Sequence, residues 1–95
     1  MDFNWSNPPF NLESTMKLQS IEESFEDPFA VRLLPDSPRF SLQARFFNLG
    51  TSLDGTGIFS IYKTNGKQVR VIYSRRFESE EQFLYQRKLN AALAQ

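Results

Sequence analysis

The sequence predicts an α+β fold, in which helices pack on one face of a mostly antiparallel four-stranded sheet and a C-terminal helix ends the chain. Three observations lead to this fold class. Polar and apolar residues alternate over residues 40–49, which is the period of a half-buried strand. Asn65 and Gly66 separate two apolar runs, as in a tight hairpin. After Ser79, apolar residues recur at helical spacing.

The N-terminal residues predict a short edge strand followed by a helix. Residues 2–5 (DFNW) form the strand. Asn7 can cap a helix that runs to about Leu18, because its side chain accepts hydrogen bonds from free backbone N–H groups. Pro8 then occupies the first helical position, where its missing N–H costs nothing.

A second helix and a strand come next. Ser20 and Glu23 have the spacing of a capping box, which predicts a short helix over residues 21–27. Pro28 ends this helix, because proline cannot continue the helical hydrogen bonds. Residues 29–34 (FAVRLL) predict a strand of the sheet.

The strand at residues 40–49 carries its apolar side chains on one face, namely Phe40, Leu42, Ala44 and Phe46. The two later strands, at 58–63 and 67–74, form a hairpin with a two-residue type I′ turn at Asn65-Gly66. The register of such a turn pairs Tyr62 with Val69, Ile61 with Arg70 and Ile58 with Tyr73.

Both faces of this hairpin carry many apolar side chains. One face packs on the helices, so the other needs a cover or serves as a contact surface for a partner or a second copy. A regular strand also places Arg75 on the face of Tyr73, and Arg76 on the face of Arg70.

The last helix begins at Ser79, with Gln82 completing a capping box. Glu80 and Glu81 suit the positive helix start. The apolar stripe of this helix consists of Tyr85, Leu89, Ala92 and Leu93.

Composition excludes several classes of function. The chain has no Cys and no His, so disulfides, Cys-based zinc sites and Ser-His-Asp or Cys-His catalysis are excluded within it. We find no metal-binding or cofactor motif. No segment resembles a membrane span or signal peptide, so we expect a cytoplasmic protein without a membrane partner. A length of 95 residues fits a single domain, residues 1–95.

Charge is distributed unevenly along a chain of zero net charge. Residues 1–38 hold two bases against seven acids, whereas residues 39–95 hold nine bases against four acids. Such asymmetry can mark an electrostatic binding face. The alternative is that acidic helices lie beside a basic sheet and neutralise it.

Two adjacent arginines, Arg75 and Arg76, lie where the last strand ends. The planar guanidinium of arginine matches phosphate, and the nearby helix start offers free N–H groups. With the interleaved aromatic residues, a basic sheet is a plausible RNA surface. The structural alternative is that both arginines pair with the acids that follow, at Glu78, Glu80 or Glu81.

The order of these residues resembles the BrnT toxin family over most of residues 3–85. Phe3 and Trp5 resemble the family's opening motif, and SIEESFEDP at 20–28 resembles its short acidic helix. The later matches, in chain order, are Arg45, Phe46, Leu49, Gly50, Ser52, Gly55, Arg70, Ile72, Ser74, Arg75, Arg76 and Tyr85. Ser74 is shifted against the family's usual spacing.

This resemblance implies a RelE/ParE-like fold, ribonuclease activity and neutralisation by a small antitoxin of the ribbon-helix-helix type. Arg75 and Arg76 would then bind phosphate and stabilise the transition state, and Arg70 would be a second contact. Tyr85 would donate or orient a proton, and Lys17 is a candidate general acid. The residues expected to bind RNA are Arg45, Lys63, Lys67 and Ser74.

One departure from the family affects the predicted activity. BrnT-like proteins usually carry Lys-His-Gly between their first two helices, where this chain reads Lys17, Leu18 and Gln19. If that His takes part in cleavage, the ribonuclease is weakened or inactive. The alternative prediction is therefore a non-catalytic module that binds a partner, or a second copy in a homodimer, through the exposed sheet face.

Overall fold

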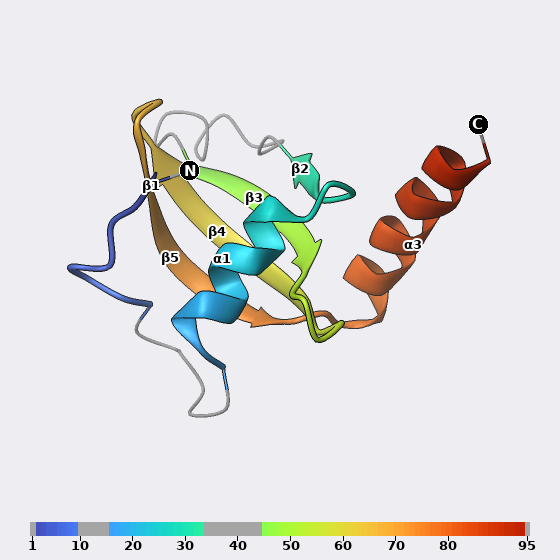
Figure 1. Cartoon of the computed structure of the whole chain (residues 1–95), viewed down its shortest axis with the longest axis horizontal. Helices are drawn as coiled ribbons and strands as arrows, with labels where there is room; N and C mark the ends of the chain where they lie inside the picture. The colour runs from blue at the N-terminus through green and yellow to red at the C-terminus, as the bar shows by residue number, and fades with distance from the viewer. Residues whose placement is uncertain (1, 10–15, 34–44, 95) are drawn as a thin grey trace.

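The computed structural model describes residues 2–9, 16–33 and 45–94. These residues form an α+β fold with two helices and a five-stranded, mostly antiparallel sheet, ended by a C-terminal helix (Figure 1). The elements are β1 (Asp2–Phe3), α1 (Leu18–Glu26), β2 (Val31–Leu33), β3 (Arg45–Thr51), β4 (Gly57–Thr64), β5 (Gln68–Arg76) and α3 (Ser79–Leu93).

The sheet has the order β1-β5-β4-β3-β2. The strands from β2 to β5 are antiparallel to their neighbours, whereas β1 is parallel to β5, with Phe3 opposite Val69. The expected edge strand therefore extends the sheet from four strands to five, although it covers two residues only.

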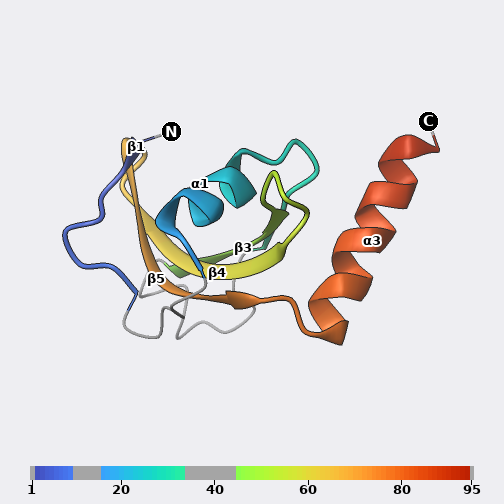
Figure 2. The ribbon, with the colours of Figure 1, turned by 60° about the horizontal axis from the view of Figure 1, so that its bottom comes forward.

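The two helices contact opposite faces of the sheet, which corrects the expectation of helices on one face. The side-chain amide of Asn48 in β3 donates to the Ser24 carbonyl of α1 over 3.3 Å. The next residue of β3, Leu49, is buried with Tyr85 of α3. Because successive strand residues point to opposite faces, α1 and α3 lie on different sides. Figure 2 shows α1 above the sheet and α3 standing at its end.

The larger core lies between α1 and the sheet. Ile21 and Phe25 of α1 are almost fully buried, with exposed fractions of 0 and 2 %. They pack with Ile58 and Tyr62 of β4 and with Val71 of β5. This burial of apolar surface supplies most of the favourable free energy of folding.

The helix α1 approaches β3 closely at Gly50. A Cβ atom at this position would overlap the carbonyl oxygen of Ser24. The exposed end of α1 is also tied to the sheet, since Arg32 of β2 donates to the Phe25 carbonyl over 2.9 Å. Glycine in β3 and a basic residue in β2 together hold α1 on the sheet.

The helix predicted from Asn7 to Leu18 is absent where the structure describes the two ends of that segment. Residues 7–9 and 16–17 are not helical, and residues 10–15 lie outside the described residues. The helix α1 begins at Leu18 rather than after Ser20, so Ser20 lies inside it. Packing explains the earlier start, because Leu18 contacts the core beneath the helix.

The capping box expected at Ser20 and Glu23 is therefore wrong. The Glu23 carboxylate instead accepts a hydrogen bond from the backbone N–H of Leu53, over 3.0 Å. This contact ties α1 to the loop between β3 and β4.

The strand boundaries shift modestly from those predicted. The strand expected at 29–34 is β2, of three residues. The strand expected at 40–49 is described from Arg45, and its first five residues lie outside the described residues. It continues to Thr51, two residues beyond the predicted end.

The hairpin turn is longer than the predicted two-residue turn. Thr64 pairs with Val69. The Asn65 side chain accepts hydrogen bonds from the backbone N–H groups of Lys67 and Gln68, over 2.8 and 2.9 Å. An Asn side chain that bonds the backbone in this way favours a wider turn. As a result, Tyr62 lies opposite Val71 instead of Val69.

A β-bulge then changes which side chains of β5 share a face. Ile61 pairs with Tyr73 and Tyr62 pairs with Val71, which leaves Ile72 as the extra residue. Beyond the bulge, Ser74 and Arg76 therefore point toward the α1 side, and Arg75 stays on the side of Tyr73.

This bulge corrects the prediction that Arg70 and Arg76 share a face. Arg76 pairs with Ile58, whose side chain is buried under α1. Arg70 pairs with Lys63, whose side chain points to the opposite face. The extra residue between the two arginines is the physical reason.

The final helix begins at Ser79, as predicted, but its capping residue is Glu78. The capping box joins Glu78 and Glu81, because both side chains accept backbone N–H groups. Tyr85 is buried and Leu89 half-buried, whereas Leu93 is 66 % exposed. Among the described residues, neither helix is long and apolar enough to cross a membrane.

Candidate functional site

Arg75 is held in place by contacts within the chain. Its guanidinium Nη1 lies 2.5 Å from Glu81 Oε1 of α3, in an ion pair that is mostly buried. The same guanidinium lies 4.6 Å from the centre of the Phe59 ring, in a cation–π contact. The structural alternative raised by the sequence is therefore confirmed for Arg75. A phosphate that bound Arg75 would compete with Glu81.

The protonation states of this pair are set by their mutual contact. The hydrogen bond to Glu81 raises the pKa of Arg75 above its usual value. The hydrogen bond from Arg75 lowers the pKa of Glu81, and the bond from the Glu78 backbone N–H lowers it further. Both groups are therefore charged at neutral pH.

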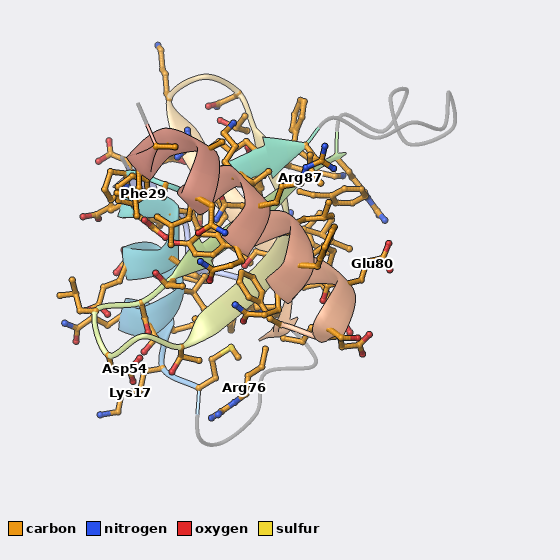
Figure 3. The ribbon with its side chains drawn as sticks, turned by 90° about the vertical axis from the view of Figure 1, so that its right-hand side faces the viewer. Lys17, Phe29, Asp54, Arg76, Glu80 and Arg87 are labelled. Carbon is orange, nitrogen blue, oxygen red and sulfur yellow. The ribbon has the colours of Figure 1, made fainter. Side chains whose placement is uncertain are left out.

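Arg76 ends β5 on the α1 side and is exposed. Figure 3 shows Arg76, Lys17 and Asp54 at the same end of the molecule. Lys17 is the exposed N-cap residue of α1. Hydrogen bonds from Ser52 and Thr56, with a smaller effect from the positive charge of Arg76, lower the pKa of Asp54 to about 2. Of the predicted catalytic residues, Arg76 and Lys17 thus share one solvent-facing end.

Tyr85 is 5 % exposed and is part of a hydrogen-bond cluster. Its hydroxyl donates to Asp27 Oδ2 over 2.5 Å. The same oxygen accepts from the backbone N–H and the hydroxyl of Thr51, over 2.9 and 3.0 Å. Tyr85 thus has the structural role that the sequence allowed for it, since it begins the apolar stripe and is buried, whereas its role in moving a proton during cleavage stays a prediction.

Electrostatics within this cluster oppose loss of the Tyr85 proton. Burial raises the pKa of Tyr85, and its hydrogen bond to Asp27 raises it further. Burial alone would raise the pKa of Asp27, but hydrogen bonds from Tyr85, Phe29 and Thr51 outweigh this effect and lower it. To act as a general acid, Tyr85 would first have to break its hydrogen bond to Asp27.

A second set of predicted residues lies at the other end of the sheet. Arg45 of β3 is opposite Lys63 of β4, and Lys63 is opposite Arg70 of β5. Their side chains form a row on the face turned away from α1, which we call the basic row. Arg70 is five residues from Arg75 along β5, roughly 17 Å. The basic row is therefore separate from the arginine pair.

The basic row borders an open cleft of about 310 Å³. The residues that line the cleft are Asn4, Lys63, Thr64, Asn65, Gln68 and Arg70, none of which is acidic. Lys67 lies beside it in the exposed hairpin turn. Like charges opposite one another on neighbouring strands destabilise a sheet. An anion bound across the row would remove this repulsion.

Ser74 does not belong to either exposed group. It is 1 % exposed, and its hydroxyl lies 2.9 Å from that of Ser60 beneath α1. The bulge at Ile72 turns Ser74 inward, so a ligand on the surface cannot reach it in this conformation.

The sequence did not indicate the roles of Asp27 and Thr51 in these contacts. Asp27 precedes Pro28 and was interpreted only as part of a helix end, whereas Glu81 was among the three acids expected to pair with the arginines. The role of Glu81 in the capping box was not predicted, although its spacing of three residues from Glu78 fits that motif. No local signal connects Asp27 to Tyr85.

No family model, curated protein or solved structure matches this chain. The resemblance to the BrnT family therefore depends on the order of the sequence motifs alone. The structure shows an α+β fold with a five-stranded sheet and a C-terminal helix.

Proposed function

We propose that this chain binds RNA through the basic row, as a toxin component that resembles the BrnT family and its RelE/ParE-like fold. The row itself is the observation that carries the proposal. Arg45, Lys63 and Arg70 are aligned across three neighbouring strands, with Lys67 beside them. Consecutive phosphates of a single RNA strand can contact such a row, and the released counterions favour binding.

Cleavage, in this proposal, takes place at the opposite end of the sheet and is weak. Arg76 would stabilise the charge that develops on the phosphate, with Lys17 as the proton donor. The weakness follows from two observations. Arg75 and Tyr85 are already bonded to Glu81 and Asp27. The Lys-His-Gly motif of the family also lacks its His here.

The proposed partner is an antitoxin of the ribbon-helix-helix type, in the cytoplasm. A second candidate function is a non-catalytic interaction module, which the sheet face opposite α1 favours. There Phe59 stacks at an angle on Phe47 and meets Tyr73 edge to face. All three rings are only partly buried among the described residues.

RNA binding is tested with the folded chain and a fluorescent single-stranded RNA at several salt concentrations. The Lys63→Ala/Arg70→Ala variant should bind about tenfold more weakly, and its salt dependence should fall by about 1.4 in slope, since two phosphate contacts are lost. The matched control is Arg87→Ala/Lys88→Ala, which removes two charges from α3 and should bind RNA as the wild type does. Equal binding by both variants would contradict the proposal.

Cleavage is tested separately, with and without ribosomes. The wild type should release RNA fragments slowly, and Lys17→Ala/Arg76→Ala should release none while still binding RNA. A wild type that binds RNA and never cleaves it would leave the binding proposal intact and reject the ribonuclease.

A further inference from the structure

An apolar groove of about 320 Å³ lies between the edge strand β2 and the helix α3. Val31 and Leu33 of β2 line one side, and Leu84 and Ala91 of α3 line the other. Leu33 and Leu84 are each 37 % exposed. Covering the aliphatic side chains that face one another across this open groove would remove apolar surface from water, which is favourable.

The rim of this groove is positively charged. Arg87 and Lys88 line it together with the four aliphatic residues, and none of the described residues that line it is acidic. Figure 3, which looks onto α3, shows Arg87 beside β2. Neither Arg87 nor Lys88 forms an ion pair with another described residue. The groove therefore combines an apolar floor with two cations that form no ion pair with any other residue in the described part of the chain.

We propose that the groove is the docking site for a short segment of another protein, in which apolar residues stand next to Asp or Glu. The apolar side chains fill the space between β2 and α3, and the carboxylates pair with Arg87 and Lys88. This inference does not rest on the proposed RNA binding, because the basic row is a different set of residues. A contact of this size gives modest affinity, since it covers a small area.

The lining of the groove favours a protein segment over RNA. Single-stranded RNA binds on aromatic side chains, against which its bases stack. The groove offers Val31, Leu33, Leu84 and Ala91, none of which is aromatic. RNA could contact the two cations, but it would leave the aliphatic floor in contact with water.

The strand β2 also suits a segment with alternating side chains. Val31 and Leu33 point into the groove, whereas Arg32 points to the α1 side and bonds the Phe25 carbonyl. Among the described residues, β2 is the last strand of the sheet at this edge. Edge strands commonly accept extended segments of partner proteins.

The test selects a displayed library of random heptapeptides on the immobilised full chain. The most enriched peptides are then synthesised, and their affinities are measured for folded variants. We expect enriched peptides to contain aliphatic residues next to Asp or Glu. Their affinity should fall at least about tenfold for Leu84→Ser and for Arg87→Ala/Lys88→Ala. The control Lys63→Ala/Arg70→Ala should bind them as the wild type does.

Two further measurements complete the test. Amidation of the peptide carboxylates should weaken binding to the wild type and have no effect on binding to Arg87→Ala/Lys88→Ala. Sedimentation of the free chain decides whether a second copy occupies the groove instead. The proposal is overturned if no peptide is enriched, if the groove variants bind peptides as tightly as the wild type, or if the chain forms a dimer that Leu84→Ser dissociates.

Discussion

Tyr85 of α3 donates its hydroxyl proton to the carboxylate of Asp27, 58 residues earlier in the chain, over 2.5 Å. Asp27 follows the last residue of α1, so this hydrogen bond joins the two helices around the end of the sheet. Thr51 of β3 donates to the same carboxylate oxygen. One half-buried carboxylate thus connects three elements, which predicts measurable effects on stability.

Tyr85→Phe removes the hydroxyl and keeps the ring. We expect the free energy of unfolding to fall by about 2 kcal/mol, because a hydrogen bond to a charged group is lost. Urea unfolding at pH 7 measures this. The matched control is Tyr62→Phe, because the hydroxyl of Tyr62 has no hydrogen-bond partner among the described residues. That control should change stability by less than about 0.5 kcal/mol. Similar losses in both variants would show that the Asp27 bond contributes little.

Asp27→Asn should change how stability depends on pH. The hydrogen bonds to Asp27 lower its pKa in the folded protein below its usual value of 3.8. A carboxylate with a lowered pKa stabilises the fold above the unfolded pKa, and this contribution is lost as the pH falls below it. The free energy of unfolding of the wild type should therefore exceed that of the variant by about 1–2 kcal/mol at pH 7. This difference should shrink below pH 4.

Urea unfolding at pH 7, 5, 4 and 3 follows the difference between these two proteins. Glu26→Gln is the control, because Glu26 is an exposed acid that ends α1 and has no hydrogen bond or ion pair with another described residue. A difference between wild type and Asp27→Asn that stays constant over this range would contradict the role of the Asp27 charge.

Local signals in the sequence were sufficient for most elements. The alternation that ends at Leu49, the Asn-Gly pair and the residues around Ser79 each determine structure over short distances. The strands β3, β4 and β5 and the helix α3 accordingly lie where they were expected, within a few residues. The parallel pairing of β1 with β5 could not be obtained in this way, because the two strands lie far apart along the chain.

The arrangement of the candidate site depended on features that no short stretch encodes. The bulge at Ile72 arises from pairing between β4 and β5, and it moves Arg76 and Ser74 to the α1 side. Alternation alone could not reveal this change. The basic residues Arg45 and Lys63 were expected near RNA, but their alignment with Arg70 follows from the register of three strands.

Arg75→Ala and Arg76→Ala form a matched pair that separates structural from functional roles. Arg75 is paired with Glu81 and covers Phe59, so its loss should cost about 2 kcal/mol of unfolding free energy, whereas loss of the exposed Arg76 should cost about 0.5 kcal/mol or less. Urea unfolding and RNA cleavage are measured on the same preparations. Cleavage should be lost in Arg76→Ala without a loss of stability.

A reversed order of stabilities would contradict the structural role of Arg75. Glu81→Gln provides the control for the ion pair, since it keeps the shape of the side chain and removes its charge. It should destabilise the fold in the same direction as Arg75→Ala, and the double variant should lose less than the sum of the two single changes, because the residues are in contact.

Gly50→Ala tests the close approach of α1 to β3. The added Cβ would overlap the backbone carbonyl of Ser24. Because the clashing atoms belong to the helix backbone and not to a flexible side chain, they cannot move aside without shifting α1. We expect a loss of about 3 kcal/mol in unfolding free energy, with α1 displaced from the sheet. The control is Gly66→Ala, where φ is +89° but no atom lies within 4 Å of the added Cβ. This change should cost only about 1 kcal/mol, through backbone strain. Equal losses in the two variants would mean that α1 can move away from β3 at little cost.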